Sequence, residues 1–94
     1  MEITVLQTTL FARQKKKLKK NRIQALDNAI REICQDPLIG VEKKGDLKGV
    51  FVYKFKILRQ EYLLAYEWNV RTRTLIALGV HENFYRDLKK YRKN

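Results

Sequence analysis

The chain has 94 residues, 45% of them hydrophobic, with one proline and four glycines. This length and composition fit one ordered domain, which we expect to span residues 1–94, and exclude a disordered chain. Lysine and arginine outnumber aspartate and glutamate by 21 to 10, so the net charge is +11 and the partner we expect is anionic: nucleic acid, an anionic membrane or an acidic protein.

Cysteine and histidine each occur once, so the chain has no internal disulfide and lacks the ligands of a zinc site; we expect neither a metal nor a cofactor. The longest apolar runs, 62–66 and 75–80, are far shorter than the ~20 residues that span a bilayer. No signal sequence is visible at the start, where Glu2 replaces the usual basic segment. These features predict a cytoplasmic protein that does not bind a membrane.

The first half of the chain predicts one strand followed by a helical hairpin. The β-branched run 3–6 is typical of a strand. Thr8 or Thr9 can cap a first helix, and Asn21 can cap a second one that ends at Asp36. A single long helix that bends at Asn21 is the alternative. The second helix has one apolar stripe at helical spacing, made of Ile23, Leu26, Ile30, Ile33 and Cys34.

The second half predicts three strands and a final helix. Strand-like runs at 50–58, 61–68 and 73–80 are joined by short turns, which indicates an antiparallel meander, and 82–92 returns to a helical pattern. The order β-α-α-β-β-β-α predicts an α+β fold, an antiparallel twisted sheet with the N-terminal helical hairpin packed on one face. The other face of the sheet is then open.

Side-chain alternation divides the first strand of the meander into two rows. One row is aromatic and suits the core under the helices; it comprises Phe51, Tyr53, Phe55 and Ile57. The other row carries Lys54 and Lys56, whose like charges do nothing for folding but suit a phosphate backbone, RNA above all. An ordinary solvated sheet face is the alternative.

The same alternation, applied to the last strand, groups Leu75, Ala77, Gly79 and His81 on one face. His81 then leaves the sheet on the lysine side, and Tyr85 follows one helical turn later. Histidine is the side chain that ionises closest to neutral pH, which suits proton transfer. A surface or capping histidine is the commoner alternative.

The order of these elements, with three segments in it, resembles the RelE/ParE toxin superfamily over essentially the whole chain. The segments are 52–56 (VYKFK), 61–66 (EYLLAY) and 78–85 (LGVHENFY), supported by Asp36-Pro37 and by Leu47-Lys48-Gly49. Members of this family are toxins of bacterial type II toxin–antitoxin systems. The resemblance implies either a nuclease that cuts messenger RNA in the ribosomal decoding site without a metal, or, as in ParE-type members, a poison of DNA gyrase.

For the nuclease branch, the resemblance implies roles for four residues. Lys54 and Lys56 hold and neutralise the RNA backbone. His81 transfers a proton or stabilises the leaving group, and Tyr85 stacks on or orients the target nucleotide. The chain departs from the family at Leu63, where RelE-like sequences have an arginine.

The cation that stabilises the transition state must therefore come from another residue. Arg59 at the hairpin turn and Arg86 beside Tyr85 are the nearest candidates by sequence, and with Lys48 they form the expected RNA-binding set.

The leading hypothesis is an endoribonuclease toxin that cleaves messenger RNA, at the ribosome or free of it, by attack of the ribose 2′-OH. Its partners are then messenger RNA, the ribosome and a small acidic antitoxin. One alternative is a ParE-like inhibitor of DNA gyrase without catalysis. Another is a non-enzymatic RNA-binding module, although the sheet lacks the exposed aromatic pair on which bases usually stack.

Overall fold

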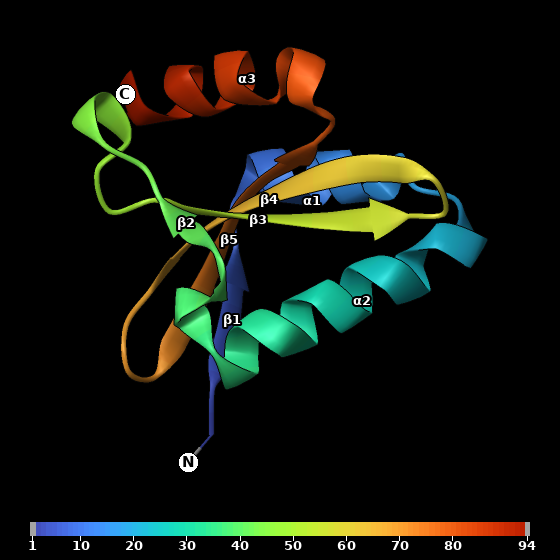
Figure 1. The fold of residues 1–94 in the computed structure, drawn as a ribbon, viewed down its shortest axis with the longest axis horizontal. Helices are drawn as coiled ribbons and strands as arrows, with labels where there is room; N and C mark the ends of the chain where they lie inside the picture. The colour runs from blue at the N-terminus through green and yellow to red at the C-terminus, as the bar shows by residue number, and fades with distance from the viewer. Residues whose placement is uncertain (1, 94) are drawn as a thin grey trace.

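The fold is known from a computed structural model, which describes residues 2–93, with side chains up to Tyr91. Figure 1 shows the arrangement of its helices and strands. These are β1 (Thr4–Gln7), α1 (Thr9–Lys16), α2 (Lys20–Gln35), β2 (Val41–Glu42), β3 (Phe51–Ile57), β4 (Gln60–Trp68), β5 (Thr72–Gly79) and α3 (His81–Lys93), with short 3-10 turns at Pro37–Ile39 and Gly45–Leu47. The predicted α+β class and order of elements are confirmed, and β2 is an addition.

The five strands form one sheet in the order β1-β5-β4-β3-β2. The antiparallel meander of β3, β4 and β5 is as predicted. Two edge strands extend it. β1 pairs with β5 in the parallel direction, which the prediction of an antiparallel sheet did not include, and β2 pairs with Phe51 and Val52 at the opposite edge.

Two separate helices follow β1, so the alternative of one long bent helix is wrong. The Thr8 hydroxyl caps α1 by accepting a hydrogen bond from the Phe11 amide at 3.0 Å. The predicted cap at Asn21 is wrong, because α2 begins one residue earlier, after an extended Lys19 that gives no side-chain cap. Burial of the apolar stripe of α2, in which Leu26 is fully buried, stabilises this helix without a cap.

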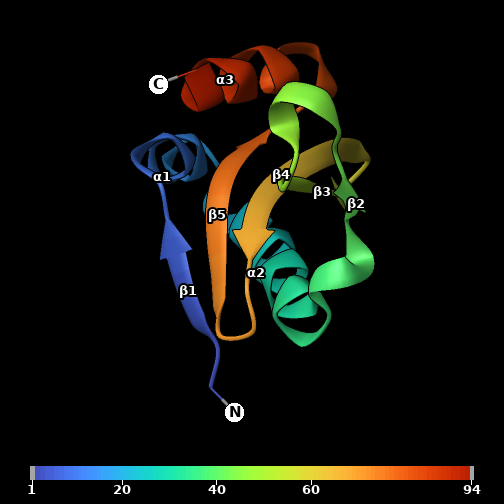
Figure 2. The same cartoon turned by 90° about the vertical axis from the view of Figure 1, so that its left-hand side faces the viewer.

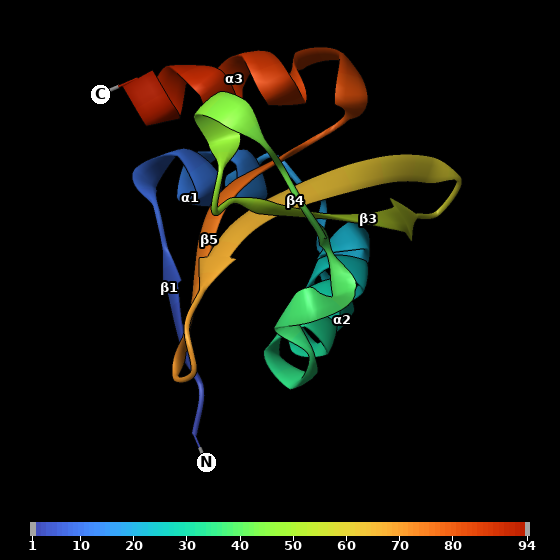
Figure 3. The same ribbon diagram turned by 60° about the vertical axis from the view of Figure 1, so that its left-hand side comes forward.

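One face of the sheet packs against α2, as expected for the helical hairpin. Figure 3 shows α2 and α3 on opposite sides of the sheet. The core on the α2 side contains Phe11, Leu26, Ile33, Leu64, Tyr66, Leu75 and Leu78. The predicted aromatic row of β3 packs against this core, with Phe51, Tyr53 and Phe55 half-buried at its margin.

The other face of the sheet is not open, which corrects the prediction. Helix α3 crosses it, and Phe84 and Leu88, one turn apart, bury themselves against Leu63 and Ala65 of β4. The sequence pattern identified the helix but not the surface on which its apolar stripe would be buried. The part of this face that carries the β3 lysines stays exposed.

A β-bulge in β5 breaks the alternation that the sequence predicted. Ala65 lies opposite Ala77, whereas the next residue, Tyr66, lies opposite Leu75. Ile76 is thus the extra residue, and it joins Ala77 in the core under α3, while Leu75 belongs to the core under α2. The prediction that Leu75 and Ala77 share a face is wrong, because a bulge shifts the alternation by one residue.

Arg73 of β5 is a buried cation that connects α2 to the sheet. It is 4% exposed. Its Nε donates to Ile33 O at 2.7 Å and its Nη2 to Cys34 O at 3.0 Å, both near the C-terminus of α2, while Nη1 donates to Asn69 O and Thr72 O at 2.8 and 3.0 Å. Carbonyl groups at a helix C-terminus carry partial negative charge, so they can stabilise the guanidinium.

Replacing Arg73 should destabilise the fold more than replacing its exposed neighbour. Arg73→Met leaves four carbonyls without their donor and should lower the free energy of unfolding by about 3 kcal/mol. Arg71→Met, at an exposed arginine two residues earlier, is the control and should change the free energy of unfolding by less than about 0.5 kcal/mol. Urea denaturation followed by circular dichroism measures both, and equal effects would contradict the role of Arg73.

Tyr53 provides a second connection between α2 and the sheet, through a hydrogen bond from its hydroxyl to the Glu32 carboxylate. This hydrogen bond, together with burial, raises the pKa of Tyr53 to about 12. Only the neutral phenol can donate, so the bond contributes fully to stability below the ordinary pKa of ~10. That contribution is lost as the pH rises through the raised pKa of the folded state.

A titration of tyrosinate absorbance in the folded protein should therefore contain one tyrosine that ionises near pH 12. Glu32→Gln removes the carboxylate charge and should move that transition toward ~10. Glu42→Gln, at an exposed glutamate on the edge strand β2, is the matched control and should leave it in place. Identical titrations of the wild type and Glu32→Gln would refute this connection.

Candidate functional site

Tyr85 of α3 is the centre of the candidate site. Its ring is half-buried and packs against the core under α3. The His81 ring, one helical turn earlier, lies edge-on to it with centroids 5.5 Å apart and an angle of 71° between the ring planes. On its other side, the Phe84 ring meets Tyr85 at 5.0 Å, also edge-on. The buried Phe84 thus fixes the position of Tyr85, while His81 is exposed.

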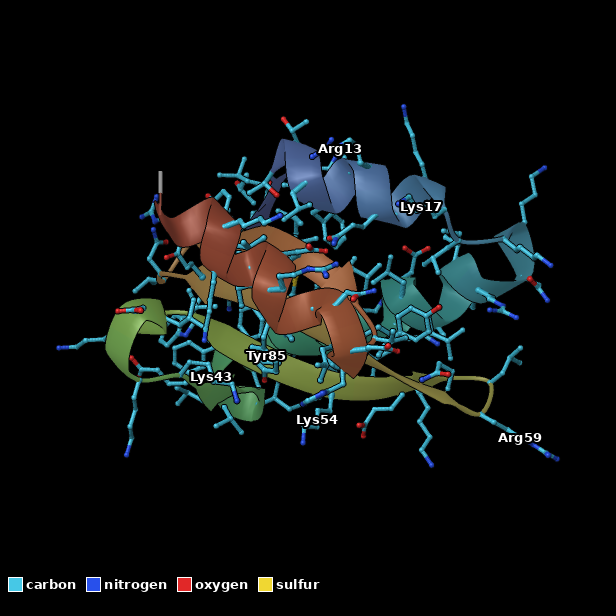
Figure 4. All side chains as sticks on the ribbon, turned by 90° about the horizontal axis from the view of Figure 1, so that it is seen from above. Arg13, Lys17, Lys43, Lys54, Arg59 and Tyr85 are labelled. Atoms are coloured by element: carbon cyan, nitrogen blue, oxygen red, sulfur yellow. The ribbon has the colours of Figure 1, made fainter. Side chains whose placement is uncertain are left out.

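Lys43 contributes an ammonium group that sequence analysis missed. Its Nζ lies 5.3 Å from the centroid of the Tyr85 ring, in the geometry of a cation–π contact. Figure 4 shows Lys43 and Lys54 on the same flank of α3 as Tyr85. No pattern in the sequence marks Lys43, because its position depends on the path of the loop between α2 and β3.

Tyr66 holds that loop in place. Its hydroxyl donates to Pro37 O at 2.7 Å and accepts from the Gly40 amide at 3.0 Å. Burial raises the pKa of Tyr66, which keeps the hydroxyl protonated and able to donate. A Cβ on Gly40 would lie 2.7 Å from this hydroxyl, so the contact requires glycine. Directly after Gly40, β2 pairs with β3, and the Lys43 amide donates a hydrogen bond to Val50 O at 2.9 Å.

The two predicted lysines of β3 lie on the face that α3 partly covers, next to buried Val52, and both are exposed. Lys54 and Lys43 line one shallow hollow of about 380 Å³, whose floor includes Val52. Lys56 lies two residues further along the strand, opposite Glu61. Among residues 2–93, neither Lys54 nor Lys56 has an acidic side chain within ion-pair distance.

The remaining predicted cations, Arg59, Lys48 and Arg86, do not form one group. Arg59 lies at the tip of the β3–β4 hairpin and points away from α3 in Figure 4. Lys48 precedes β3 whereas Arg59 follows it, so roughly 20 Å of strand separates them. Arg86 lies on α3 with its side chain 66% exposed, and its Nε is 3.8 Å from Asp87 Oδ1.

Leu63, where the related nucleases have an arginine, is fully buried beneath α3 and lies opposite Lys54 in the β3–β4 pairing. No cation therefore reaches the site from this position. Of the sequence-predicted residues, the fold gathers Tyr85, His81 and Lys54 on one flank of α3, with Lys56 further along β3.

Within the described part of the chain, no group of three or more His, Cys, Asp or Glu side chains is arranged so that it could hold a metal ion. No helix in residues 2–93 has both the length and the apolar character to cross a membrane.

Solved structures similar to this chain are bacterial toxins. A double arginine-to-alanine mutant of Escherichia coli toxin RelE in the free state superposes with a TM-score of 0.74 at 16% identity, covering 99% of this chain and 98% of that one. The intact E. coli RelBE toxin–antitoxin complex gives 0.67 at 20% identity over 85% of this chain and 98% of that one. The YoeB/ParE toxin from Agrobacterium tumefaciens gives 0.67 at 15% identity, over 84% and 99%.

At these identities the structural similarity supports the fold alone, and no curated protein matches the sequence. The sequence itself matches the family model for the ParE-like toxin of type II bacterial toxin–antitoxin systems over residues 5–89. That match spans most of the chain and agrees with the predicted superfamily. The chain therefore belongs to the ParE-like toxins of type II bacterial toxin–antitoxin systems.

Proposed function

We propose that this toxin is a metal-independent endoribonuclease that cleaves messenger RNA at the ribosome, in the cytoplasm. The observation that supports it most is that His81 and Lys43 both contact the Tyr85 ring, and that Lys43 lines one hollow with the exposed Lys54. This grouping combines a proton-transfer group, an aromatic surface for a base and two ammonium groups. A non-catalytic poison would not need all three together.

The proposed reaction is attack of a ribose 2′-OH on the adjacent phosphate. It gives a 2′,3′-cyclic phosphate and a free 5′-OH, and it needs a base, an acid and positive charge around the phosphate. His81 exchanges protons with the reacting oxygens, and Tyr85 stacks on or orients the nucleotide. Lys54 and Lys56 hold the backbone.

Lys43 is our candidate for the missing family arginine. Leu63 is buried, Arg59 points away from the site, and Arg86 lies on the exposed side of α3 next to Asp87. The Lys43 ammonium, from the residue that follows β2, lies over the Tyr85 ring, and Lys43 also lines the hollow that contains Lys54. The ammonium groups of Lys43 and Lys54 would then neutralise the pentavalent phosphate.

A toxin of a type II system has an antitoxin protein as partner, and one similar structure is a toxin–antitoxin complex. For this chain we propose a small acidic antitoxin, because the toxin carries a net charge of +11. It would prevent cleavage by covering the exposed Lys54 and Lys56.

Inhibition of DNA gyrase without catalysis is the second candidate. Two observations favour it: the matching family model is ParE-like, and Leu63 replaces the arginine of RelE-like nucleases. It predicts loss of supercoiling activity when toxin is added to gyrase, with RNA left intact.

Cleavage by the purified toxin of messenger RNA on ribosomes tests the first proposal. His81→Ala should lower the rate roughly 10²–10⁴-fold with little change in binding. Lys54→Ala and Lys56→Ala should weaken binding, and the difference from the wild type should be greatest at low salt. Lys16→Ala, an exposed lysine on α1, is the control. EDTA should not slow the chemical step, provided that Mg²⁺ is kept high enough to maintain the ribosomes.

Near-normal cleavage by both His81→Ala and Tyr85→Ala would remove these residues from the reaction. Intact RNA together with gyrase inhibition would replace the nuclease proposal by the second candidate.

The buried position of Leu63 has its own testable consequence. Leu63→Arg, which restores the family residue, should destabilise the fold by several kcal/mol and not raise activity, because the guanidinium would enter the core under α3. Lys54→Arg, at the exposed cross-strand neighbour, is the control and should leave stability nearly unchanged. Thermal unfolding measures both. A stable Leu63→Arg variant with faster cleavage would contradict this account of the site.

A further inference from the structure

A second cavity lies on the other flank of α3, between α3, α1 and the end of the sheet. Its volume is about 260 Å³, below the roughly 300–1,000 Å³ of pockets for drug-sized ligands. Gly79 and Val80, the residues just before His81, line it. In Figure 2, α1 and α3 approach each other at the end of the sheet where β5 runs into α3. A ligand here would lie close to His81 without occupying the Tyr85 site.

The polar groups of this cavity come in two pairs that face each other. On α3, Asn83 and Asp87 are four residues apart. Gln14 of α1 and Lys17, the C-cap of that helix, are three residues apart, so each pair shares one helix face. Gln14 Oε1 accepts a hydrogen bond from the Leu78 amide at 2.7 Å. That bond fixes the orientation of the side-chain amide and leaves its Nε2 as a donor.

Asp87 is the unexpected member of the cavity. It also lines an adjoining groove of about 440 Å³ between α1 and α3, where Arg13 and Lys90 are neighbours. Although its surroundings are basic, the negative charge of this carboxylate would repel a phosphate group. Its side chain is 34% exposed, and its ion pair with Arg86 is long, at 3.8 Å. Both carboxylate oxygens can therefore accept hydrogen bonds from a ligand.

A carboxylate accepts two parallel hydrogen bonds from a group with two adjacent donors. Among the RNA bases, guanine has such an edge, with N1–H and the N2 amino group side by side and the O6 acceptor beside them. Gln14 Nε2 and the Lys17 ammonium, from residues that line the same cavity, can donate hydrogen bonds to O6. Adenine and cytosine place a ring acceptor next to their amino group, and uracil has a single donor, so each would leave the carboxylate poorly paired.

We infer that this cavity is a guanine-binding subsite, with Asp87 as the residue that selects the base. The half-buried Tyr62 ring lines the same cavity and supplies aromatic surface against which a base can lie. The inference rests on the proposed RNA substrate and adds a base preference to it. A guanosine of the RNA is held on the α1 side of α3 while the nucleotide at the cleavage site meets Tyr85 on the other side.

Binding of free nucleotides tests the subsite independently of cleavage. The ¹⁵N-labelled toxin is titrated separately with guanosine, adenosine, cytidine and uridine monophosphates, and amide shifts near Gly79 and Asn83 are followed. Guanosine monophosphate should bind roughly 10-fold more tightly than the others. Asp87→Asn, which is isosteric, should abolish this preference, and the spectrum of the variant reports its fold. Glu82→Gln removes an exposed acid of the same helix that does not line the cavity, and it should preserve the preference.

Equal affinities for the four nucleotides, no shifts near the cavity, or an unchanged preference in Asp87→Asn would overturn the inference. Mapping of cleavage sites separates this result from the proposed function. If wild type and Asp87→Asn cleave RNA with the same base preference, the nuclease proposal is upheld and the guanine subsite is refuted. If the toxin binds guanosine monophosphate through Asp87 but does not cleave RNA, the subsite is upheld and the nuclease proposal is refuted.

Discussion

The buried guanidinium of Arg73 is the interaction on which the arrangement of helices and sheet depends. Its four acceptors are backbone carbonyls from the end of α2 and from the turn before β5, so the charge is stable only while these segments stay together. This fixes α2 on one face of the sheet. Tyr66 then anchors the loop that follows α2, and through that loop the position of Lys43.

Helix α3 divides the basic surface into two regions with different chemistry. On one flank, Lys43 contacts Tyr85 and lines one hollow with Lys54, and these cations suit a phosphate group. On the other flank, Arg13 and Lys17 project from α1, and Asp87 lies in the cavity between the two helices. His81, the first residue of α3, packs edge-on against Tyr85 and follows Gly79 and Val80, which line that cavity. An RNA strand that crosses the start of α3 could therefore contact phosphate-binding and base-reading groups in turn.

The sequence predicted the strands and helices well where periodicity was unbroken. The two rows of β3 were predicted correctly because this strand alternates without a bulge, whereas the extra residue Ile76 in β5 invalidated the alternation there. The apolar spacing of Phe84 and Leu88 indicated a helix but not which surface it would cover. Lys43 and Asp87 could not be assigned to sites at all, because both assignments depend on contacts between segments distant in the chain.

The central claim is that the site around Tyr85 promotes attack by the ribose 2′-OH, and a single atom of the substrate tests it. Cleavage positions are first mapped on a short messenger RNA bound to ribosomes. The same messenger is then prepared with one 2′-deoxy nucleotide immediately 5′ of the principal cleavage position. We predict that wild-type toxin cuts the all-ribose messenger to a 2′,3′-cyclic phosphate end and leaves the deoxy messenger intact at that position. Equal cleavage of both messengers would contradict the mechanism.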